Sequence, residues 1–391
     1  MSNETQALTS RGEGAFAFRL YGLVTGDEDA RLCRDIPEDQ CREQPRSFLC
    51  QVLAQALSKT GDTLADSKVV LPWLLGLVGA PAFLVGLLVP IRESLALIPQ
   101  ILVGGVIRRF PVRKGFWAGS SVVEGICVIL MGVVAAAGLA GAAAGWAIVG
   151  LLVVFSLARG IASVAAKDTL GKTVSKGRRG RVSGYAATGS GLVAGAVGVY
   201  LAFSPEAARP DWALYAILIA AGLAWFLAAA VFSLINEYPG ATEGGRGVRD
   251  LVRDQVALLI RDPELQKFLA ARTLMIATAL AGPVYVGLAQ RETGQALDGL
   301  GWLVIASGLA SAVSSSLWGA FADRSSRLVM AAGAGLAAAL GFAVLAALAL
   351  LPAACSVSAS PTRACASAAR PTSSISPAAT ARPSTWRSAT P

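Results

Sequence analysis

The chain has 391 residues, of which 54% are hydrophobic and only 15% charged, and its formal net charge is +9. Soluble domains usually carry about 25% charged residues, whereas windows of about twenty residues almost free of charge are typical of membrane spans. The chain has no histidine, and its six cysteines form no C-x-x-C pair. This composition argues against HExxH metal sites, histidine-based triads, zinc sites and disulfide frameworks, so we expect no metal, no cofactor and no enzyme activity.

The apolar windows follow a polar N-terminal segment, residues 1–46, which lacks a basic-then-apolar signal sequence and is expected to be a cytoplasmic tail. After it, helical spans are expected because backbone groups in lipid must bond within the segment. The first span contains Lys59, Asp62, Asp66 and Lys68. Nine spans are predicted, at 47–79, 82–107, 116–139, 144–166, 182–204, 211–235, 268–289, 299–321 and 328–352.

Loop charge tests this layout and its orientation. With the N-terminus inside, the inside loops 108–114, 167–181, 236–267 and 322–327 hold 17 Lys and Arg, and the outside loops before the C-terminal tail hold two. This is a strong positive-inside bias, and it favours an integral protein of the bacterial inner membrane. Because topology explains the basic residues, no nucleic-acid partner is expected.

The longest inside loop, 236–267, separates six spans from three. Its stretch V-R-D-L-V-R-D-Q-V-A-L-L-I-R-D has apolar residues at helical spacing with charges between them. This pattern predicts an amphipathic helix at the membrane surface.

The chain contains an internal repeat, in which residues 86–114 match residues 301–327 at a constant offset of 215. Each of these two segments is a span followed by a basic inside loop. The second ends in G-A-F-A-D-R-S-S-R (319–327), which resembles the G-x-x-x-D-R-x-x-R loop of the major facilitator superfamily. The resemblance implies an all-α polytopic membrane protein, a helical bundle of two halves with about nine of the usual twelve spans. The implied parts are a six-helix half at 47–235, the loop at 236–267 and an incomplete half at 268–352.

In that family the loop is a latch for one conformational state. The first copy, G-G-V-I-R-R-F-P-V-R-K, departs from the pattern, since Arg108 stands where the family has Asp. The alternative is an ordinary basic inside loop. The latch residues implied by the resemblance are Gly104, Arg108, Arg109, Arg113, Lys114, Gly319, Asp323, Arg324 and Arg327.

Ionisable residues inside spans are costly and should face a cavity or a partner. Arg92 and Glu93 lie near the middle of the second span, followed by Pro99 and Gln100. Being adjacent, Arg92 and Glu93 point about 100° apart and are not expected to pair. They either contact substrate or protons, or hold neighbouring helices together.

The stretch L-A-R-G-I-A-S (157–163) resembles the arginine-containing fourth-span motif of proton-coupled drug antiporters in the same superfamily. The resemblance implies proton coupling by Arg159, and the alternative is a helix-packing salt bridge. Further candidates for substrate or proton coupling are Glu124 in the third span and Arg272 in the seventh. Asp62 either carries a proton or lies in a polar turn.

After Leu351 the composition changes, and residues 353–391 are rich in Ala, Ser, Pro, Thr and Arg, which predicts disorder. One permitted codon choice for 372–390, shifted by two bases, encodes a stretch with the R-x-x-x-Y spacing of Arg181 and Tyr185. This leads to the hypothesis that the tail is read out of frame.

The sequence as a whole favours a secondary active transporter that moves a small solute by alternating access, with proton coupling as an option. A monomer in a lipid bilayer is expected, with a small-molecule solute and protons as its ligands. The alternative is a non-transporting membrane protein, either a truncated remnant or a scaffold that binds a partner.

Overall fold

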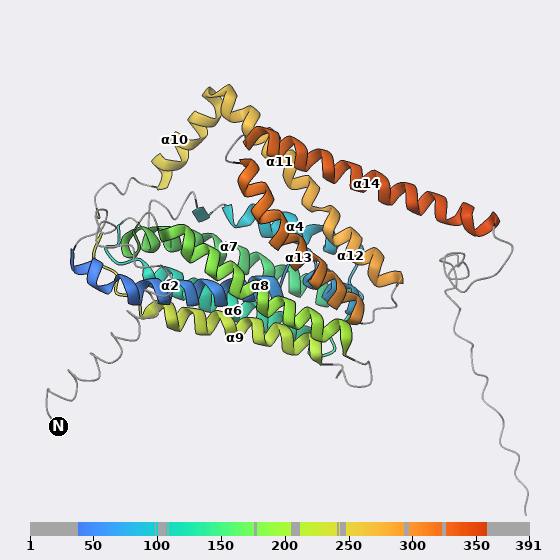
Figure 1. The fold of residues 1–391 in the computed structure, drawn as a ribbon, viewed down its shortest axis with the longest axis horizontal. Coiled ribbons are helices and arrows are strands. Elements are labelled where there is room, and N and C mark those ends of the chain that lie inside the picture. The colour runs from blue at the N-terminus through green and yellow to red at the C-terminus, as the bar shows by residue number, and fades with distance from the viewer. Residues whose placement is uncertain are drawn as a thin grey trace, which may run out of the picture. The chain divides into compact units, whose positions relative to one another are not determined.

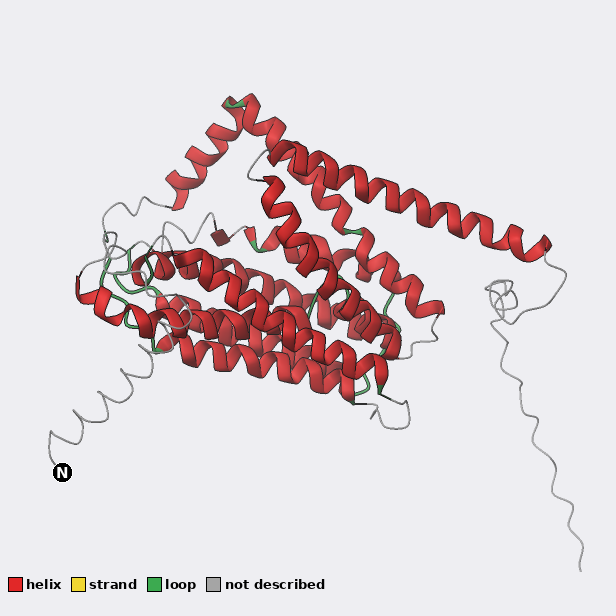
Figure 2. Cartoon of the chain, viewed as in Figure 1, coloured by secondary structure: helices red, strands yellow, loops and turns green. Residues whose placement is uncertain are grey.

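The computed structural model describes residues 38–97, 99–100, 107, 109–175, 178–204, 212–240, 242, 248–292, 297–322 and 326–357. These described residues form helices and no strands (Figures 1 and 2). They are α2 (Glu38–Leu64), α3 (Val70–Leu77), α4 (Ala82–Leu95), α6 (Lys114–Ala136), α7 (Gly141–Thr173), α8 (Arg179–Phe203), α9 (Ala213–Ser233), α10 (Val248–Arg261), α11 (Pro263–Ala279), α12 (Ala281–Glu292), α13 (Leu297–Ala322) and α14 (Ser326–Val357).

Four of these helices, α6 to α9, are long and apolar enough to cross a membrane. Shorter apolar stretches lie at Leu297–Ala310 and Met330–Ala346. Since a bilayer core requires about twenty apolar residues of helix, the chain is a helical membrane protein. The third to sixth predicted spans coincide with α6 to α9 to within a few residues, except at the end of α7.

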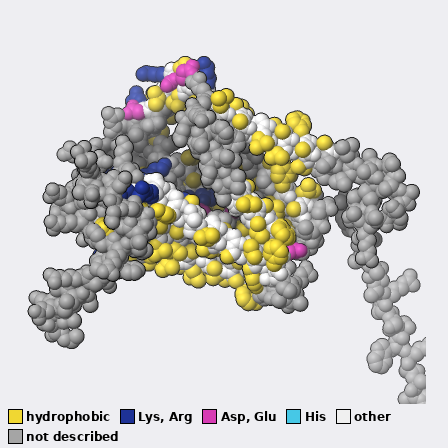
Figure 3. All heavy atoms as spheres, viewed as in Figure 1, with side chains coloured by type: hydrophobic (Ala, Val, Ile, Leu, Met, Phe, Trp, Pro, Cys, Tyr) yellow, Lys and Arg dark blue, Asp and Glu magenta, His cyan; other side chains and the backbone are white. Residues whose placement is uncertain are grey.

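Hydrophobic side chains cover the outside of these helices as well as their core. Leu192 and Phe203 of α8 are exposed, as are Leu223 and Leu227 of α9. Figure 3 shows hydrophobic side chains spread over the visible face of this part, while charged side chains are grouped at α10, with further Lys and Arg side chains below it in the view. An apolar surface of this extent is what lipid contact requires.

Small residues bring the helices close together. A Cβ atom on Gly125 of α6 would lie 2.7 Å from the carbonyl oxygen of Gly222 on α9, and the reverse distance is also 2.7 Å. On α2, a Cβ atom on Gly61 would lie 2.7 Å from the ring of Trp225 on α9. Glycines that allow helices to approach this closely favour helix association in lipid.

Several predicted elements are interrupted or longer than the sequence suggests. The first predicted span is two helices, α2 and α3, because Asp66 accepts hydrogen bonds from the backbone N–H groups of Lys68 and Val69 and holds a turn between them. The seventh is also two, α11 and α12, with a break at Leu280. Helix α2 begins at Glu38, inside the segment expected to be a tail, and α7 continues to Thr173, into the predicted loop 167–181. The helix predicted within 236–267 is α10.

The chain divides into two compact units, Met1–Met330 and Ala331–Pro391. The first holds α2 to α13, where α13 packs along α8 and α12 packs on α3 and α4. The second holds most of α14. The predicted division into halves at 236–267 stays a prediction, and so does the reading of the tail, since residues 358–391 lie outside the described part.

Candidate functional site: a buried cluster of opposite charges

Four of the ionisable side chains singled out in the sequence meet between four helices. Asp62 lies near the end of α2, where its Oδ1 accepts a hydrogen bond of 2.8 Å from Nη2 of Arg92 on α4. Its Oδ2 pairs with Nη2 of Arg159 on α7. Nη1 of Arg159 also lies 3.4 Å from Oε2 of Glu124 on α6. Two arginines and two carboxylates thus form one connected cluster.

The cluster is enclosed by the bundle to different degrees. The Glu124 side chain is 0% exposed, whereas those of Asp62, Arg92 and Arg159 are 20–26% exposed. Buried ions of opposite charge are stable only when they are paired and hydrogen-bonded. Oε1 of Glu124 is buried and makes no hydrogen bond within the described part of the chain.

Neighbouring side chains position the two arginines. Ser58, one turn before Asp62 on α2, accepts a 2.9 Å hydrogen bond from Nη1 of Arg159. The Arg92 guanidinium lies over the ring of Phe155, 4.7 Å from its centroid, in a cation–π contact. Phe155 packs edge-on against Trp225 at 5.3 Å between centroids. Both aromatic side chains are buried, so Trp225 packs against Phe155 and holds in place the ring that Arg92 contacts.

Sequence reasoning missed Ser58 and Phe155, because a serine or phenylalanine in an apolar helix resembles ordinary packing. A signal was nonetheless present. Ser58 precedes Asp62 by four residues and Phe155 precedes Arg159 by four, and residues four apart share a helix face.

The remaining candidates for coupling lie elsewhere. Glu93 pairs with Lys68 at 3.2 Å, and both side chains are more than 40% exposed. Arg92 and Glu93 therefore have different partners, as their angular separation predicts. Gln100 donates to the backbone oxygen of Ala96 on its own helical turn at 3.1 Å. Arg272 is in α11, and its side chain lies outside the described ones.

A second ionic network joins the ends of α6, α7 and α9. Arg113 pairs with Asp168, and Nζ of Lys172 lies 3.1 Å from Asp168 and 2.8 Å from Glu237. Glu237 also accepts the backbone N–H groups of Arg113 and Lys114, at 2.6–3.0 Å, at the N-terminus of α6. A carboxylate is stabilised there by the helix dipole and the unpaired N–H groups. Loops that the charge count assigns to one side of the membrane therefore meet at one end of the bundle.

This network contains two of the residues predicted as latches, Arg113 and Lys114. Arg109 is exposed. Gly319 lies in α13 and Arg327 in α14, and the Arg327 side chain lies outside the described ones. The other predicted latch residues lie outside the described part, namely Gly104, Arg108, Asp323 and Arg324.

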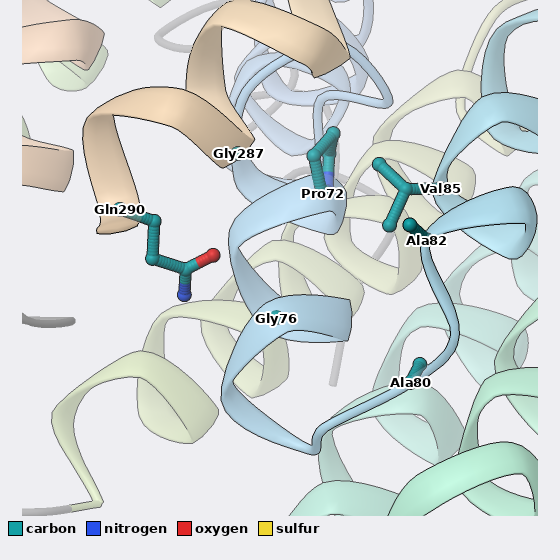
Figure 4. A pocket seen from close by; sticks show the side chains of 7 residues that line it. All are labelled: Pro72, Gly76, Ala80, Ala82, Val85, Gly287 and Gln290. Atoms are coloured by element: carbon teal, nitrogen blue, oxygen red, sulfur yellow. The ribbon is translucent and has the colours of Figure 1, made fainter. Parts of the chain in front are cut away.

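A small cavity of about 200 Å³ lies away from the charges, between α3, α4 and α12. Figure 4 shows its lining, in which Gln290 reaches toward Gly76. The Nε2 of Gln290 donates a 3.0 Å hydrogen bond to the backbone oxygen of Trp73. The lining residues are Pro72, Gly76, Ala80, Ala82, Val85, Gly287 and Gln290. They carry no charge, so the cavity offers fewer recognition groups than the cluster.

Comparisons of the chain with protein families, with curated proteins and with solved structures gave no match. Among the described residues, no group of three or more His, Cys, Asp or Glu side chains is placed to hold a metal ion. The buried charge cluster is therefore the feature from which a function has to be inferred.

Proposed function

We propose that this chain is a proton-coupled secondary active transporter of the major facilitator type, in which Asp62, Arg92, Glu124 and Arg159 couple protons to a small solute. The observation that carries the proposal is the cluster itself, since charges inside membrane helices are costly and mark substrate or proton pathways. A purely structural role would be served as well, or better, by apolar side chains of similar volume.

Each carboxylate of the cluster can either bind a proton or pair with an arginine. Asp62 uses one oxygen for each arginine, so a proton on Asp62 weakens both contacts at once. Glu124 depends on Arg159 for its one described ion pair. Binding a proton would therefore loosen contacts between α2, α4, α6 and α7, and such loosening between helices is what a transporter needs to change state.

Packing within the first unit supports alternating access. Gly301 of α13 fits against the backbone of Ala202 near the end of α8, where its Cβ atom would lie 2.4 Å from the Ala202 nitrogen. Gln290 of α12 bonds to Trp73 of α3. Both contacts lie at the end of the bundle opposite the Arg113–Glu237 network, and alternating access requires contacts that close one end at a time.

We further propose that the Arg113–Glu237 network faces the cytoplasm, because the loops that form it are the basic ones. With this orientation the N-terminus is cytoplasmic. The proposed complete arrangement has two halves of spans, of which the described helices supply the first half and part of the second.

The test is solute-dependent proton movement. The purified chain would be reconstituted into proteoliposomes loaded with the pH indicator pyranine and challenged with sugars, amino acids, monocarboxylates and organic cations. We expect at least one class to change the lumenal pH, and Arg159→Ala to abolish the change. Lys267→Gln is the matched control, since Lys267 is exposed and pairs only with Glu264 one turn away among its described contacts.

Solute entry with no proton movement would refute the coupling. Silence toward every class, together with tight association with another membrane protein, would favour a non-transporting scaffold.

A further inference from the structure

We infer that the solute is a small monocarboxylate, bound by Arg92 and carried together with one proton that sits on Asp62. This inference rests on the proposed function and adds the substrate class and the proton site. The cluster holds two positive and two negative groups, so its charges sum to zero.

Neutrality of the cluster restricts what it can carry. An empty cluster without an added proton is neutral, and a cluster that holds one proton and one monoanion is neutral as well. Net charge in a low-dielectric site is costly. These two neutral states are therefore the ones in which the protein can most easily change between its outward-open and inward-open conformations. Exchange of a cation against a proton would leave one net positive charge in both states.

The surrounding charges do not alter this balance. Lys59 on α2 donates to the backbone of Ser183, Asp66 caps the turn before α3, and Lys68 pairs with Glu93. These four groups also sum to zero. The other ionisable groups in the middle of the helices packed here are Cys127 of α6, Tyr185 and Tyr200 of α8 and Tyr215 of α9. The remaining ones lie toward the basic end of the bundle: those of residues 38–50 in α2, Lys114 of α6, Lys167, Asp168 and Lys172 of α7, and Arg179 and Arg181 of α8.

Arg92 is the arginine with donors to spare. Arg159 is engaged with Ser58, Glu124 and Asp62, whereas the described contacts of Arg92 are one hydrogen bond to Asp62 and the ring of Phe155. Its side chain is 20% exposed, and its Nε and Nη1 groups make no hydrogen bond among its described contacts, so a ligand that reaches the guanidinium finds donors there.

A proton on Asp62 completes the site. The neutral carboxyl group holds Arg92 less strongly, so Nη2 becomes available beside Nη1. Two neighbouring N–H donors form the fork that a planar carboxylate binds with two hydrogen bonds. The ring of Phe155 keeps the guanidinium in place while Asp62 is neutral. Proton and anion therefore bind together and each strengthens the other.

Binding can be measured on the full chain in detergent, without transport. The probe is acetate, the smallest stable monocarboxylate, and its neutral control is acetamide, which has the same shape. Affinity is read from the dependence of the unfolding temperature on acetate concentration, at constant ionic strength. Asp62→Asn mimics the protonated state and is expected to bind acetate about tenfold or more tightly than the wild type at pH 8.5.

Three further results are expected. Acetate binding to the wild type weakens between pH 6 and pH 8.5, while that of Asp62→Asn changes less. In the double variant Asp62→Asn/Arg92→Gln the cluster is neutral again, and this variant should lose the tighter acetate binding of Asp62→Asn. Acetamide stabilises none of the proteins.

Equal binding of acetate to Asp62→Asn and to the double variant would overturn the inference, and so would wild-type affinity that rises with pH. Stabilisation by tetramethylammonium in place of acetate would also overturn it. If acetate binds as expected but proteoliposomes show no flux, the transporter proposal fails while the ligand assignment stands. If the protein instead exchanged a cation for protons, the transporter proposal would stand and the assignment of a monocarboxylate as the solute would fail.

Discussion

At the scale of single residues, Arg159 is the connection on which the cluster depends. It is the described partner of Glu124, whose side chain is fully buried. Arg159→Ala should therefore destabilise the protein by about 3–5 kcal/mol, the cost of leaving a buried charge without its partner. The free energy of unfolding in detergent measures this directly.

A second substitution identifies the origin of that loss. Glu124→Gln, added to Arg159→Ala, removes the uncompensated charge and should recover a substantial part of the stability. A double variant as unstable as Arg159→Ala alone would show that the loss comes from packing and not from the Glu124 charge.

Phe155 gives a prediction that isolates the contact with Arg92. A double-mutant cycle of Phe155→Leu and Arg92→Gln should yield a coupling energy of about 0.5–2 kcal/mol, the range of cation–π contacts. Phe155→Tyr keeps the aromatic face and should retain most of the coupling. A cycle with no coupling would mean that Phe155 serves only the core.

The cluster could be predicted from the sequence only in part. Asp62, Arg92, Glu124 and Arg159 stand out because ionisable residues are rare inside apolar segments. Which carboxylate meets which arginine depends on helix register and rotation, and these follow from contacts such as Gly61 against Trp225, which no periodicity encodes. The same pattern also predicts Glu93 and Gln100 as coupling residues, although Glu93 is exposed and Gln100 bonds within its own helix.

At the scale of helices, the crossing of α6 and α9 depends on the absence of side chains at Gly125 and Gly222. A Cβ atom at Gly125 would contact backbone, which cannot rotate away, so Gly125→Ala should cost about 1–3 kcal/mol. Gly119→Ala on the same helix is the matched control, since a Cβ atom there meets nothing within 4 Å. Equal thermal unfolding of the two variants would contradict the close crossing.

Glu237, which follows α9, links α6, α7 and α9 at the end of the bundle where α6 begins. It accepts two backbone N–H groups at the start of α6 and pairs with Lys172 of α7 while fully buried itself. Glu237→Ala should cost about 3–5 kcal/mol in unfolding free energy, because it leaves Lys172 without this partner. Glu264→Ala, at an exposed pair on α11, should leave unfolding unchanged.

Apolar runs of about twenty residues predict α6 to α9 well, because the bilayer alone dictates their length. The break between α2 and α3 was less visible, since Asp66 could be read as a buried charge as easily as the turn residue that it is. The network around Glu237 was not predicted, because that residue lies in a loop where acidic side chains are common.

At the scale of the whole molecule, the proposed orientation follows from the basic loops. Cysteines introduced for Arg109 and for Leu139, in the loop between α6 and α7, should respond differently to a membrane-impermeant maleimide. With the native Cys33, Cys41, Cys50, Cys355 and Cys365 replaced by Ser, Leu139→Cys should label in intact cells. Arg109→Cys should label only after permeabilisation, and the reverse pattern would invert the topology.

Proton coupling through Asp62 is decided by proton entry into proteoliposomes that hold either the wild-type chain or Asp62→Asn. The solute is gluconate, a monocarboxylate that crosses lipid slowly, and pyranine reports the lumenal pH. Coupling through the cluster predicts that gluconate acidifies the lumen with the wild type and not with Asp62→Asn, which has no Asp62 carboxylate to carry the proton. Equal acidification by both proteins would contradict the account, because protons would then cross without Asp62.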